Sequence, residues 1–301
     1  MEGIISVNGQ ISSPDEARVP ALDRGFLFGD NVFEVFVGFG TKVLDLKEHL
    51  ARLRQSASNH ELPIPWTDDE LAFEIHHLMS LCPTEKKFIR LVITRGCGLG
   101  LALPEDISPN RVIYCLPAKQ EASWVYTDGL RLKRRAMGFT ERGAQSKTGN
   151  YLRSITALKQ ATVEGYHDVI WTNSEGEFTE ASTANIFFIG RTGDLVEIAT
   201  PPPTSGLLLG ITRSRIMQLL NQAHIPVTER IVSVDELARF DEAFLCSTVR
   251  GLVPIAAIDR HRLHTARKQS VFSHTLRLYM AWVESQIGYR VDWNTGVRIE
   301  Q

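Results

Sequence analysis

The sequence predicts an α+β protein with two domains, and three observations support this fold class. The chain has 301 residues, of which 43% are hydrophobic and 23% charged, so its length favours two domains over one. Strand-like runs outnumber helical runs. Segment 117–128 lacks a sustained hydrophobic period and joins two strand-like runs, which indicates a linker. We expect a small N-terminal α/β domain over 1–116 and a larger C-terminal domain, with a strand-rich core, over 129–301.

The N-terminal domain begins with strand-like and turn-like pieces. Strand-like residues from Gly3 to Val7 are followed by Asn8-Gly9, a dipeptide typical of tight turns. Thr67, with Glu70 three residues later, has the pattern of a capping box and predicts a helix start. The predicted strands cover 3–7, 32–37, 43–46, 87–94 and 111–116, and the predicted helices cover 47–59 and 68–81.

The C-terminal domain also alternates strand-like runs with turn-forming residues. Hairpin turns are predicted at 173–176 and 191–194, and the proline-rich segment 200–206 must be a loop. The predicted strands cover 129–135, 168–172, 184–189, 195–198 and 243–245. The predicted helices cover 151–164, a stretch from near Thr212 to before Pro226, and 270–286.

The composition narrows the class of protein. Lys and Arg total 33 against 35 Asp and Glu, so no broad attraction to nucleic acid or to an anionic membrane is expected. The basic run Arg131–Arg135 is interpreted as a solvated strand face. The four cysteines show no Cys-x-x-Cys spacing, no secretory signal is recognisable, and no apolar run reaches the length of a membrane span. We expect a cytoplasmic protein in a reduced compartment, and we predict no metal site.

Two polar runs carry the chemistry that points to a function. Lys147 lies in Ala144–Leu152, and Glu180, 33 residues after it, lies in Phe178–Asn185. A lysine amine can form a Schiff base with the aldehyde of pyridoxal phosphate, and a carboxylate opposite the pyridine nitrogen keeps that nitrogen protonated. Taken alone, an exposed lysine and a glutamate at a strand end explain the same residues. Their surroundings decide between the two interpretations.

A phosphate group needs N–H donors, which the start of a helix provides. Gly210-Ile211-Thr212 follows the proline-rich loop and begins a predicted helix, so Ile211 and Thr212 can offer backbone N–H groups and a hydroxyl. The alternative is that Thr212 only caps its own helix. Ser247 and Thr248 form a second hydroxyl-bearing turn, for which the alternative is an ordinary polar strand end.

Several motifs, in their order along nearly the whole chain, resemble a known family. They are Asp23–Glu34, Glu48–Leu53, the lysine and glutamate runs, Gly210-Ile211-Thr212 and Ser247-Thr248. Together they resemble the class IV aminotransferases, which have fold type IV among pyridoxal phosphate enzymes. That family includes branched-chain aminotransferases, D-amino-acid aminotransferases and aminodeoxychorismate lyases. The resemblance implies a two-domain fold type IV enzyme that uses pyridoxal 5′-phosphate and forms a homodimer.

The resemblance also implies roles for individual residues. Lys147 is similar to the lysine that forms the internal aldimine and shuttles the substrate proton, and Glu180 to the partner of the pyridine nitrogen. Arg52 resembles the arginine that clamps the phosphate, for which a guanidinium is well suited. Tyr151 resembles the tyrosine that hydrogen-bonds the cofactor's phenolic oxygen. The remaining implied phosphate contacts are Ile211, Thr212, Ser247 and Thr248, and Asn185 is interpreted as structural.

The predicted substrate contacts are Phe33, Arg90, Arg95 and Arg250. Phe88-Ile89-Arg90 resembles an aromatic-x-arginine pair of branched-chain members, with phenylalanine in place of tyrosine. The glycine-rich loop that begins at Arg95 also resembles theirs, whereas Asp30–Val35 is closer to the D-amino-acid group. Arg90 and Arg250 each have a structural alternative, an ion pair with a carboxylate.

These interpretations predict a class IV pyridoxal phosphate-dependent transaminase that moves an amino group between an amino acid and a 2-keto acid. Branched-chain specificity is favoured. One alternative is an aminodeoxychorismate lyase, and a further one is a D-amino-acid or (R)-amine transaminase. A binding protein that has kept the fold without catalysis is disfavoured, because Lys147 and Glu180 are both present.

Overall fold

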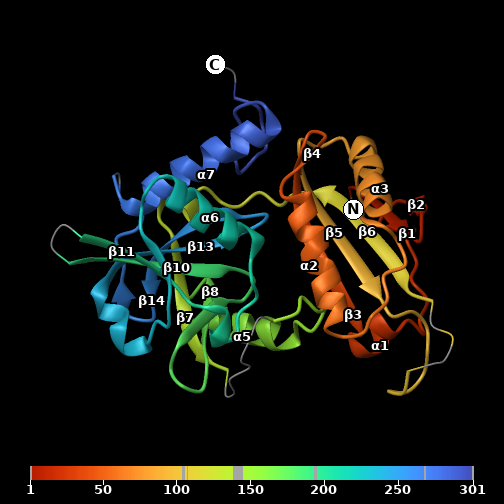
Figure 1. Cartoon of the computed structure of the whole chain (residues 1–301), viewed down its shortest axis with the longest axis horizontal. Helices are drawn as coiled ribbons and strands as arrows, with labels where there is room; N and C mark the ends of the chain where they lie inside the picture. Colours follow the sequence, from red (N-terminus) through yellow and green to blue (C-terminus); the bar gives the residue numbers. More distant parts are fainter. Residues whose placement is uncertain are drawn as a thin grey trace. The chain divides into compact units, whose positions relative to one another are not determined.

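The computed structural model describes residues 2–103, 106, 108–137, 145–192, 195–267 and 269–299. The chain forms two compact units (Figure 1). Unit 1 comprises Met1–Gln120, Ser146–Asn150 and Gln286–Gln301, and unit 2 comprises Glu121–Gln145 and Tyr151–Ser285. The units interleave along the chain, whereas the predicted domains follow chain order. The lysine segment 146–150 belongs to unit 1 by its contacts, and the predicted domain bounds remain a prediction.

Unit 1 is built on an antiparallel sheet. In the described part of unit 1 this sheet has six strands in the order β2-β1-β6-β5-β3-β4, and neighbouring strands run antiparallel. The strands are β1 (Ile4–Val7), β2 (Gln10–Ser12), β3 (Asn31–Phe39), β4 (Lys42–Val43), β5 (Lys86–Thr94) and β6 (Asn110–Pro117). Alternate residues of a strand face opposite sides of a sheet, so Phe33 and Glu34 of β3 point to different faces.

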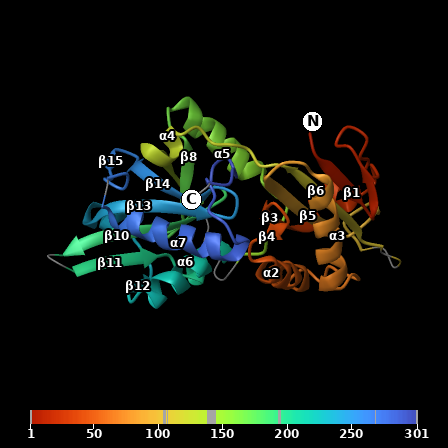
Figure 2. The same cartoon turned by 90° about the horizontal axis from the view of Figure 1, so that it is seen from above.

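Two helices, α2 (Leu46–Ser58) and α3 (Asp68–Leu81), cover one face of this sheet (Figure 2). Apolar residues at helical spacing explain the packing. The buried residues of this core include Leu50 and Leu53 of α2, Leu71, Ile75 and Leu78 of α3, and Phe36, Ile89 and Leu91 of the sheet. The predicted capping box is confirmed: Glu70 N donates to Thr67 Oγ1 at 3.2 Å and Thr67 N donates to Glu70 Oε2 at 2.7 Å.

A short helix, α1 (Arg24–Phe28), precedes β3. No sequence prediction covers it, because five residues are too few to show a helical period. Asp23 Oδ1 caps it by accepting from Gly25 N at 2.7 Å. Gly29, with φ of 70°, ends it in the left-handed conformation that glycine adopts without strain.

Unit 2 is built on a curled sheet with both strand orientations. Within the described residues, the path β12-β11-β10-β13-β14-β7-β8-β9 is hydrogen-bonded in that order, and β15 pairs with β14. The pairs β11–β12, β14–β7 and β7–β8 are parallel, and the remaining pairs are antiparallel. The strands are β7 (Leu130–Ala136), β8 (Asp168–Thr172), β9 (Phe178–Ala181), β10 (Asn185–Thr192), β11 (Leu195–Thr200), β12 (Val227–Glu229), β13 (Phe240–Ser247), β14 (Gly251–Ile258) and β15 (His261–Arg262).

Buried aromatic rings hold this sheet together. Phe187 of β10 stacks on Phe244 of β13, with ring centres 5.0 Å apart, and Phe188 contacts Phe178 and Phe240. The helices in the described part of the unit are α4 (Trp124–Thr127), α5 (Leu152–Val163), α6 (Ile211–Gln222) and α7 (Val271–Ile287), of which the last two residues belong to unit 1, with 3₁₀ turns at Pro203–Ser205 and Val234–Arg239. Paired strands and a shared aromatic core therefore fix the polar strand ends of unit 2 in place.

Most predicted elements are confirmed to within two residues, and α3 and β8 have the predicted bounds. The predicted strand 43–46 is wrong beyond its first residue, because β4 ends at Val43 and α2 begins at Leu46. The predicted linker contains helix α4, and no strand prediction covers β2, β9, β12, β14 or β15. In the predicted turn 191–194, Gly193 and Asp194 lie outside the described residues, but the antiparallel pair β10–β11 is present.

Candidate active site

The segment Ser146–Asn150, which carries Lys147, is fastened to β3 and α2 within unit 1. Phe33 N donates to Lys147 O at 3.0 Å, and Lys147 N donates to Ser56 Oγ at 3.2 Å. The Nζ atom of Lys147 lies 4.6 Å from the centre of the Phe33 ring, a cation–π contact while the amine is protonated. The lysine backbone is thus fixed, and its amine lies against an aromatic face.

Two glycines let this segment approach the start of β3. A Cβ at Gly149 would lie 2.7 Å from the Asn31 side-chain amide, and a Cβ at Gly29 would lie 2.2 Å from Asn150 Oδ1. Both distances are shorter than a carbon atom tolerates, so any other residue would displace the neighbouring asparagine. The glycine after Thr148 therefore contributes to the position of the lysine.

A buried carboxylate holds Arg52. Its Nε donates to Glu34 Oε1 at 2.7 Å and its Nη2 donates to Oε2 at 2.8 Å, a two-bond fork. His49 Nδ1 lies 2.7 Å from Glu34 Oε2, and neither the histidine nor the glutamate side chain is more than 1% exposed. Burial alone would raise the pKa of Glu34, but hydrogen bonds from Arg52 and His49, and their charges, lower it to about 2. Glu34 is therefore ionised at neutral pH, and it orients the guanidinium of Arg52.

Arg90 lies on the same face of the sheet as Phe33. Its guanidinium carbon is 4.0 Å from the centre of the Phe33 ring. Arg90 lies on β5 opposite Val35 of the neighbouring strand β3. Phe33 is only 2% exposed, so its ring is a fixed surface for both cationic side chains. The structure thus brings the predicted residues Phe33, Arg90 and Lys147 together in unit 1.

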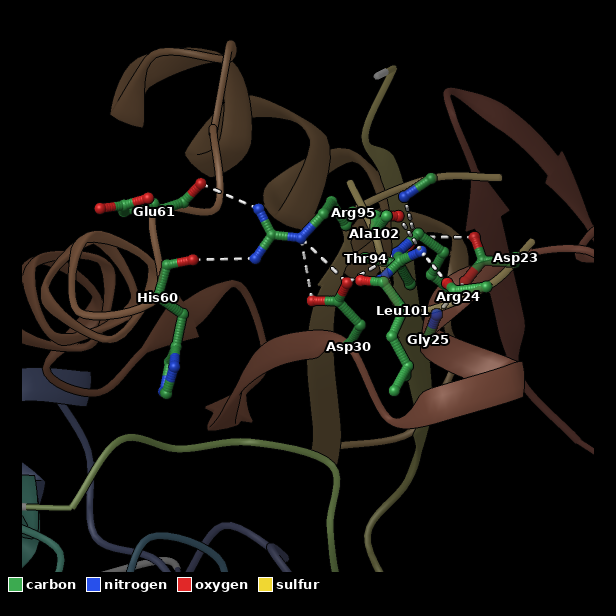
Figure 3. Close-up of polar contacts among 12 residues, drawn as sticks. Asp23, Arg24, Gly25, Asp30, His60, Glu61, Thr94, Arg95, Leu101 and Ala102 are labelled. Carbon is green, nitrogen blue, oxygen red and sulfur yellow. Dashed lines mark hydrogen bonds and ion pairs between the residues drawn. The ribbon is translucent and has the colours of Figure 1, made fainter. Parts of the chain in front are cut away.

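Arg95 uses its guanidinium to hold parts of unit 1 (Figure 3). Its Nε donates to Asp30 Oδ2 at 2.9 Å, its Nη1 to the carbonyl of Glu61 at 2.9 Å and its Nη2 to the carbonyl of His60 at 2.8 Å. The residue is 6% exposed. The guanidinium of Arg95 is therefore buried and already donates to one carboxylate and two carbonyls.

Asp30 is the shared partner of two arginines (Figure 3). Besides Arg95, it accepts from Arg24 Nε at 2.9 Å, and Arg24 Nη1 donates to the carbonyl of Gly100 at 2.7 Å. Burial would raise the pKa of Asp30, but the hydrogen bonds from Arg24 and Arg95 lower it below its usual value. The ionised carboxylate therefore ties α1 to the loop that follows β5.

In unit 2, one oxygen of the Glu180 carboxylate accepts hydrogen bonds from two neutral donors. Glu180 Oε2 accepts from Asn185 Nδ2 at 3.0 Å and from Leu208 N at 3.2 Å. Asn185 Nδ2 also donates to the carbonyl of Leu208 at 2.9 Å. Glu180 lies on β9 and Asn185 begins β10, so the turn between these strands and the loop before α6 meet at the carboxylate.

The start of α6 offers donors to an anion. The helix begins with Ile211 and Thr212, and its N-cap residue is Gly210. Because glycine has no side chain, no side-chain hydrogen bond caps the first N–H groups of α6. The interpretation of Thr212 as the cap is therefore wrong. Thr212 is 5% exposed, and its neighbour Arg213, 1% exposed, anchors the helix by donating to Thr200 Oγ1 at 3.1 Å and to the carbonyl of Pro201 at 2.8 Å.

The other predicted residues of unit 2 lie at element ends. Ser247 is the last residue of β13, and Thr248 lies in the turn to β14. Cys246, just before them, pairs with Asn185, so this turn lies beside the start of β10. Tyr151 is the N-cap residue of α5.

Arg250 lies near two carboxylates of its own unit. Its Nη1 is 3.4 Å from Asp168 Oδ2, and its Nε is 3.9 Å from Glu121 Oε1. Tyr126 donates its hydroxyl to the Arg250 carbonyl at 3.3 Å. These contacts match the ion-pair alternative for Arg250, and its substrate role remains a prediction.

Sequence reasoning did not single out Glu34, His49, Leu208 or Arg213. Glu34 and His49 lie inside two of the motifs that carry the resemblance, and His49 precedes Arg52 by three positions, which places them on one side of α2. That spacing was an available signal. Leu208 acts through its backbone, and the contacts of Arg213 come from β11, the residue after it and β12, so no local pattern marks either residue.

Other candidate sites lie apart from these residues. A groove of about 740 Å³ in unit 1 is lined by Trp66, Phe73, Glu74, Arg111 and neighbours, and none of the predicted site residues lines it. Within the described ranges, no group of three or more His, Cys, Asp or Glu side chains could hold a metal ion. No helix in those ranges is both long and apolar enough to cross a membrane.

Comparison with known proteins gives a family match over most of the chain. A family model described as amino-transferase class IV matches residues 31–258, a stretch that contains every predicted site residue. A putative branched-chain-amino-acid aminotransferase of Methanocaldococcus jannaschii is 32% identical over 259 residues, which are 85% of this chain and 88% of that protein.

Two further comparisons differ in what they name. A D-alanine aminotransferase of Bacillus licheniformis is 26% identical over 290 residues, 90% of this chain and 98% of that protein. The solved structure of the branched-chain amino acid aminotransferase of Escherichia coli superposes with a TM-score of 0.85 at 25% identity and covers 97% of each chain. The predicted fold type IV architecture is confirmed by this superposition.

Proposed function

The chain belongs to the class IV aminotransferases, a family that uses pyridoxal phosphate, and we propose that it transfers an amino group between branched-chain amino acids and 2-keto acids. The observation that carries the proposal is the environment of Glu180. Two uncharged donors, the side-chain amide of Asn185 and the N–H of Leu208, bind one oxygen of its carboxylate. Such donors favour the ionised form and add no positive charge, which suits a partner for a protonated pyridine nitrogen.

The residues of each unit fit the charges of the cofactor. In unit 2, the N-terminus of α6 has no side-chain cap, so its N–H groups suit a phosphate. In unit 1, Arg52 presents a guanidinium whose orientation is fixed by Glu34. We assign the phosphate to Arg52, Ile211, Thr212, Ser247 and Thr248, the phenolic oxygen to Tyr151 and the ring nitrogen to Glu180.

Lys147 is the proposed catalytic residue. Bound pyridoxal phosphate supplies an electron sink that stabilises negative charge on the substrate Cα. With the cofactor bound, the amine of Lys147 would take the proton from the substrate Cα as a base and would return a proton as an acid, so that one group serves both proton transfers. The backbone of Lys147 accepts from Phe33 N and donates to Ser56 Oγ, so these two hydrogen bonds hold the lysine segment without using the amine.

We assign the substrate carboxylate to Arg90. Arg90 packs on the ring of Phe33, the same ring that the amine of Lys147 contacts. Arg95 and Arg250 are the other candidates, and each lies beside a carboxylate of its own unit. Branched-chain specificity is supported by the 32% identical relative, and the D-alanine aminotransferase supports D-amino acids as the second candidate.

The proposed assembly is a homodimer in the cytoplasm. Apolar side chains of α1 and of the loop after β5 are strongly exposed in the single chain: Phe26 is 77%, Leu99 72% and Leu101 81% exposed. Exposed apolar groups on this scale are typical of an interaction surface, and a second copy of the chain is the proposed occupant. The four cysteines are free thiols, in keeping with a reduced compartment.

Absorbance spectroscopy tests the role of Lys147. The wild-type protein incubated with pyridoxal phosphate should acquire the visible band of a lysine-bound cofactor, and Lys147→Ala should lose it. Lys159→Ala, which removes an exposed lysine of α5, is the matched control and should keep the band. Retention of the band in Lys147→Ala would exclude the assigned role.

Half-reactions test the substrate class. L-leucine should convert the bound cofactor to pyridoxamine phosphate and release the corresponding keto acid, whereas D-alanine should not. Conversion by D-alanine alone would select the D-amino-acid alternative. Pyruvate release from aminodeoxychorismate, without any half-reaction with an amino acid, would select the lyase alternative.

A further inference from the structure

Asn185 connects three parts of unit 2 that the proposed function uses separately. It begins β10, is 5% exposed, and lies beside Cys246 at the end of β13. Its amide reaches Glu180 of β9 and the loop before α6. A buried amide needs hydrogen-bond partners for its polar atoms, so its contacts constrain the groups around it as well as filling space in the core.

The orientation of the amide follows from its partners. Nδ2 has two N–H groups, and it donates one to Glu180 Oε2 at 3.0 Å and one to the carbonyl of Leu208 at 2.9 Å. A flipped amide would place Oδ1 against a carboxylate oxygen and a carbonyl oxygen, and all three are acceptors. Two acceptors therefore fix Asn185 in one orientation, and Asn185 in turn fixes Glu180 Oε2.

The other atom of the amide sets the path of the chain into α6. An ideal Cβ at Gly210, the N-cap of α6, would lie 1.9 Å from Asn185 Oδ1. Gly210 has φ of −71°, which every residue can adopt, so the close approach of the asparagine, and not backbone strain, explains the glycine. Asn185 therefore touches both the carboxylate assigned to the ring nitrogen and the helix start assigned to the phosphate.

We propose that Asn185 is a positioning residue that aligns the Glu180 carboxylate with the cofactor's ring nitrogen and sets its spacing from the N-terminus of α6. This inference rests on the proposed function, because it concerns the cofactor contacts assigned there. Asn185 acts on Glu180 and on the segment Leu208–Gly210, and it takes no proton itself. Because its donors are neutral, it orients the carboxylate without compensating its charge.

The test measures the protonation of the ring nitrogen directly. Wild type and Asn185→Ala are loaded with ¹⁵N-labelled pyridoxal phosphate, and the ¹⁵N shift of the ring is recorded by NMR together with the dissociation constant of the cofactor. Asn185→Ala should move the shift toward the neutral pyridine value. Cofactor affinity should fall about tenfold, the loss expected for a hydrogen bond to a charged group.

Asn185→Asp adds a pH readout that a merely structural residue would not give. The substituted side chain keeps the shape of asparagine, but above its pKa it places a second negative charge beside Glu180. When protonated, it can again donate one hydrogen bond to the carboxylate. The ¹⁵N shift of Asn185→Asp should therefore approach the wild-type value at low pH and depart from it at high pH, whereas that of Asn185→Ala should show no such recovery.

Asn173 provides a matched control. It is 2% exposed and also donates from Nδ2 to a carboxylate, that of Glu177 at 2.7 Å, but it holds the turn between β8 and β9. Asn173→Ala should lower stability and leave the ¹⁵N shift unchanged. Gly210→Ala keeps Asn185 but displaces its amide, and it should move the shift in the same direction as Asn185→Ala.

The outcomes separate this inference from the proposed function. A wild-type protein that forms no lysine-bound cofactor would overturn both. A wild-type protein that binds the cofactor, with Asn185→Ala and Gly210→Ala both showing the wild-type shift and affinity, would overturn the role of Asn185 alone. The role of Asn185 would also be overturned if Asn173→Ala moved the ¹⁵N shift as far as Asn185→Ala does. If Asn185→Ala does not fold, Gly210→Ala and Asn185→Asp decide the question.

Discussion

Arg52 in unit 1 and Glu180 in unit 2 are both charged side chains assigned to the cofactor, yet different partners hold them. An ionised, buried carboxylate, Glu34, holds Arg52, whereas the neutral N–H groups of Asn185 and Leu208 hold Glu180. A guanidinium keeps its proton whatever its partner, so a carboxylate can orient it without changing its protonation. A carboxylate can lose its charge to a proton or share it with a cation, so neutral donors orient it and preserve its charge.

This difference also predicts unequal sensitivity to mutation. Removal of one member of a buried ion pair leaves an uncompensated charge, which costs about 3–5 kcal/mol, whereas the loss of a hydrogen bond between a charged group and a neutral donor costs about 1.5–3 kcal/mol. Substitutions that remove the carboxylate bound to Arg52 should therefore destabilise the protein more than substitutions that remove hydrogen bonds from neutral groups in unit 2.

The largest effect is expected from Glu34→Gln. The substitution leaves the guanidinium of Arg52, 13% exposed, without its anion, so the free energy of unfolding should fall by about 3–5 kcal/mol. Urea unfolding followed by circular dichroism measures the loss. Asp68→Asn is the matched control, because Arg54 and Asp68 form a pair of the same type at 2.6 Å with side chains 37% and 48% exposed. That control should cost about 1 kcal/mol or less, and equal losses in the two variants would contradict the comparison.

Acid should remove the same contribution from the wild-type protein. The pKa of Glu34 is lowered in the folded state from 4.5 to about 2, so its stabilising contribution is complete above pH 4.5 and is lost as the pH falls toward 2. The linked free energy is about 3 kcal/mol. Unfolding free energies measured from about pH 5 down to about pH 2 should fall more steeply in wild type than in Glu34→Gln. Parallel curves would show that Glu34 does not carry this part of the acid dependence.

The sequence predicts the charged groups of the candidate site better than it predicts their partners. Lys147, Glu180 and the start of α6 can be inferred because their chemistry depends on residue type and on local spacing. The partners of Arg95 could not be inferred in this way, because two of them are backbone carbonyls of His60 and Glu61, more than 30 residues earlier in the chain. A carbonyl is present at every residue, so only the folded structure shows which of them accept.

A smaller effect is expected from Thr200→Val, which tests a neutral support in unit 2. Thr200 Oγ1 donates to the carbonyl of Ile186 at 2.8 Å and accepts from Arg213 Nε at 3.1 Å. Arg213 keeps its contacts with Pro201 and Glu229 in this variant, so the free energy of unfolding should fall by about 1–2 kcal/mol. Thr228→Val, on the exposed strand β12, is the control and should change little. A loss of unfolding free energy as large as that of Glu34→Gln would contradict the expectation that a buried charged partner contributes more to stability than a neutral one.

The smallest effect is expected from Arg250→Gln, which tests whether the partner or the geometry sets the cost. Arg250 is a cation of unit 2 beside carboxylates, but its distances of 3.4 and 3.9 Å are longer than the 2.7 Å of the closest contact in the Arg52 fork. Asp168, its nearer partner, also accepts from Val169 N at 2.7 Å and so keeps a donor after the substitution. The free energy of unfolding should therefore change by about 1 kcal/mol or less.

Steady-state kinetics with L-leucine should give a KM within about threefold of wild type if Arg250 acts only in this ion pair, because a threefold change corresponds to less than about 1 kcal/mol of binding free energy. A much larger KM at unchanged stability would indicate that Arg250 binds the substrate. A large loss of stability would show that opposite charges stabilise the fold strongly even at these longer distances.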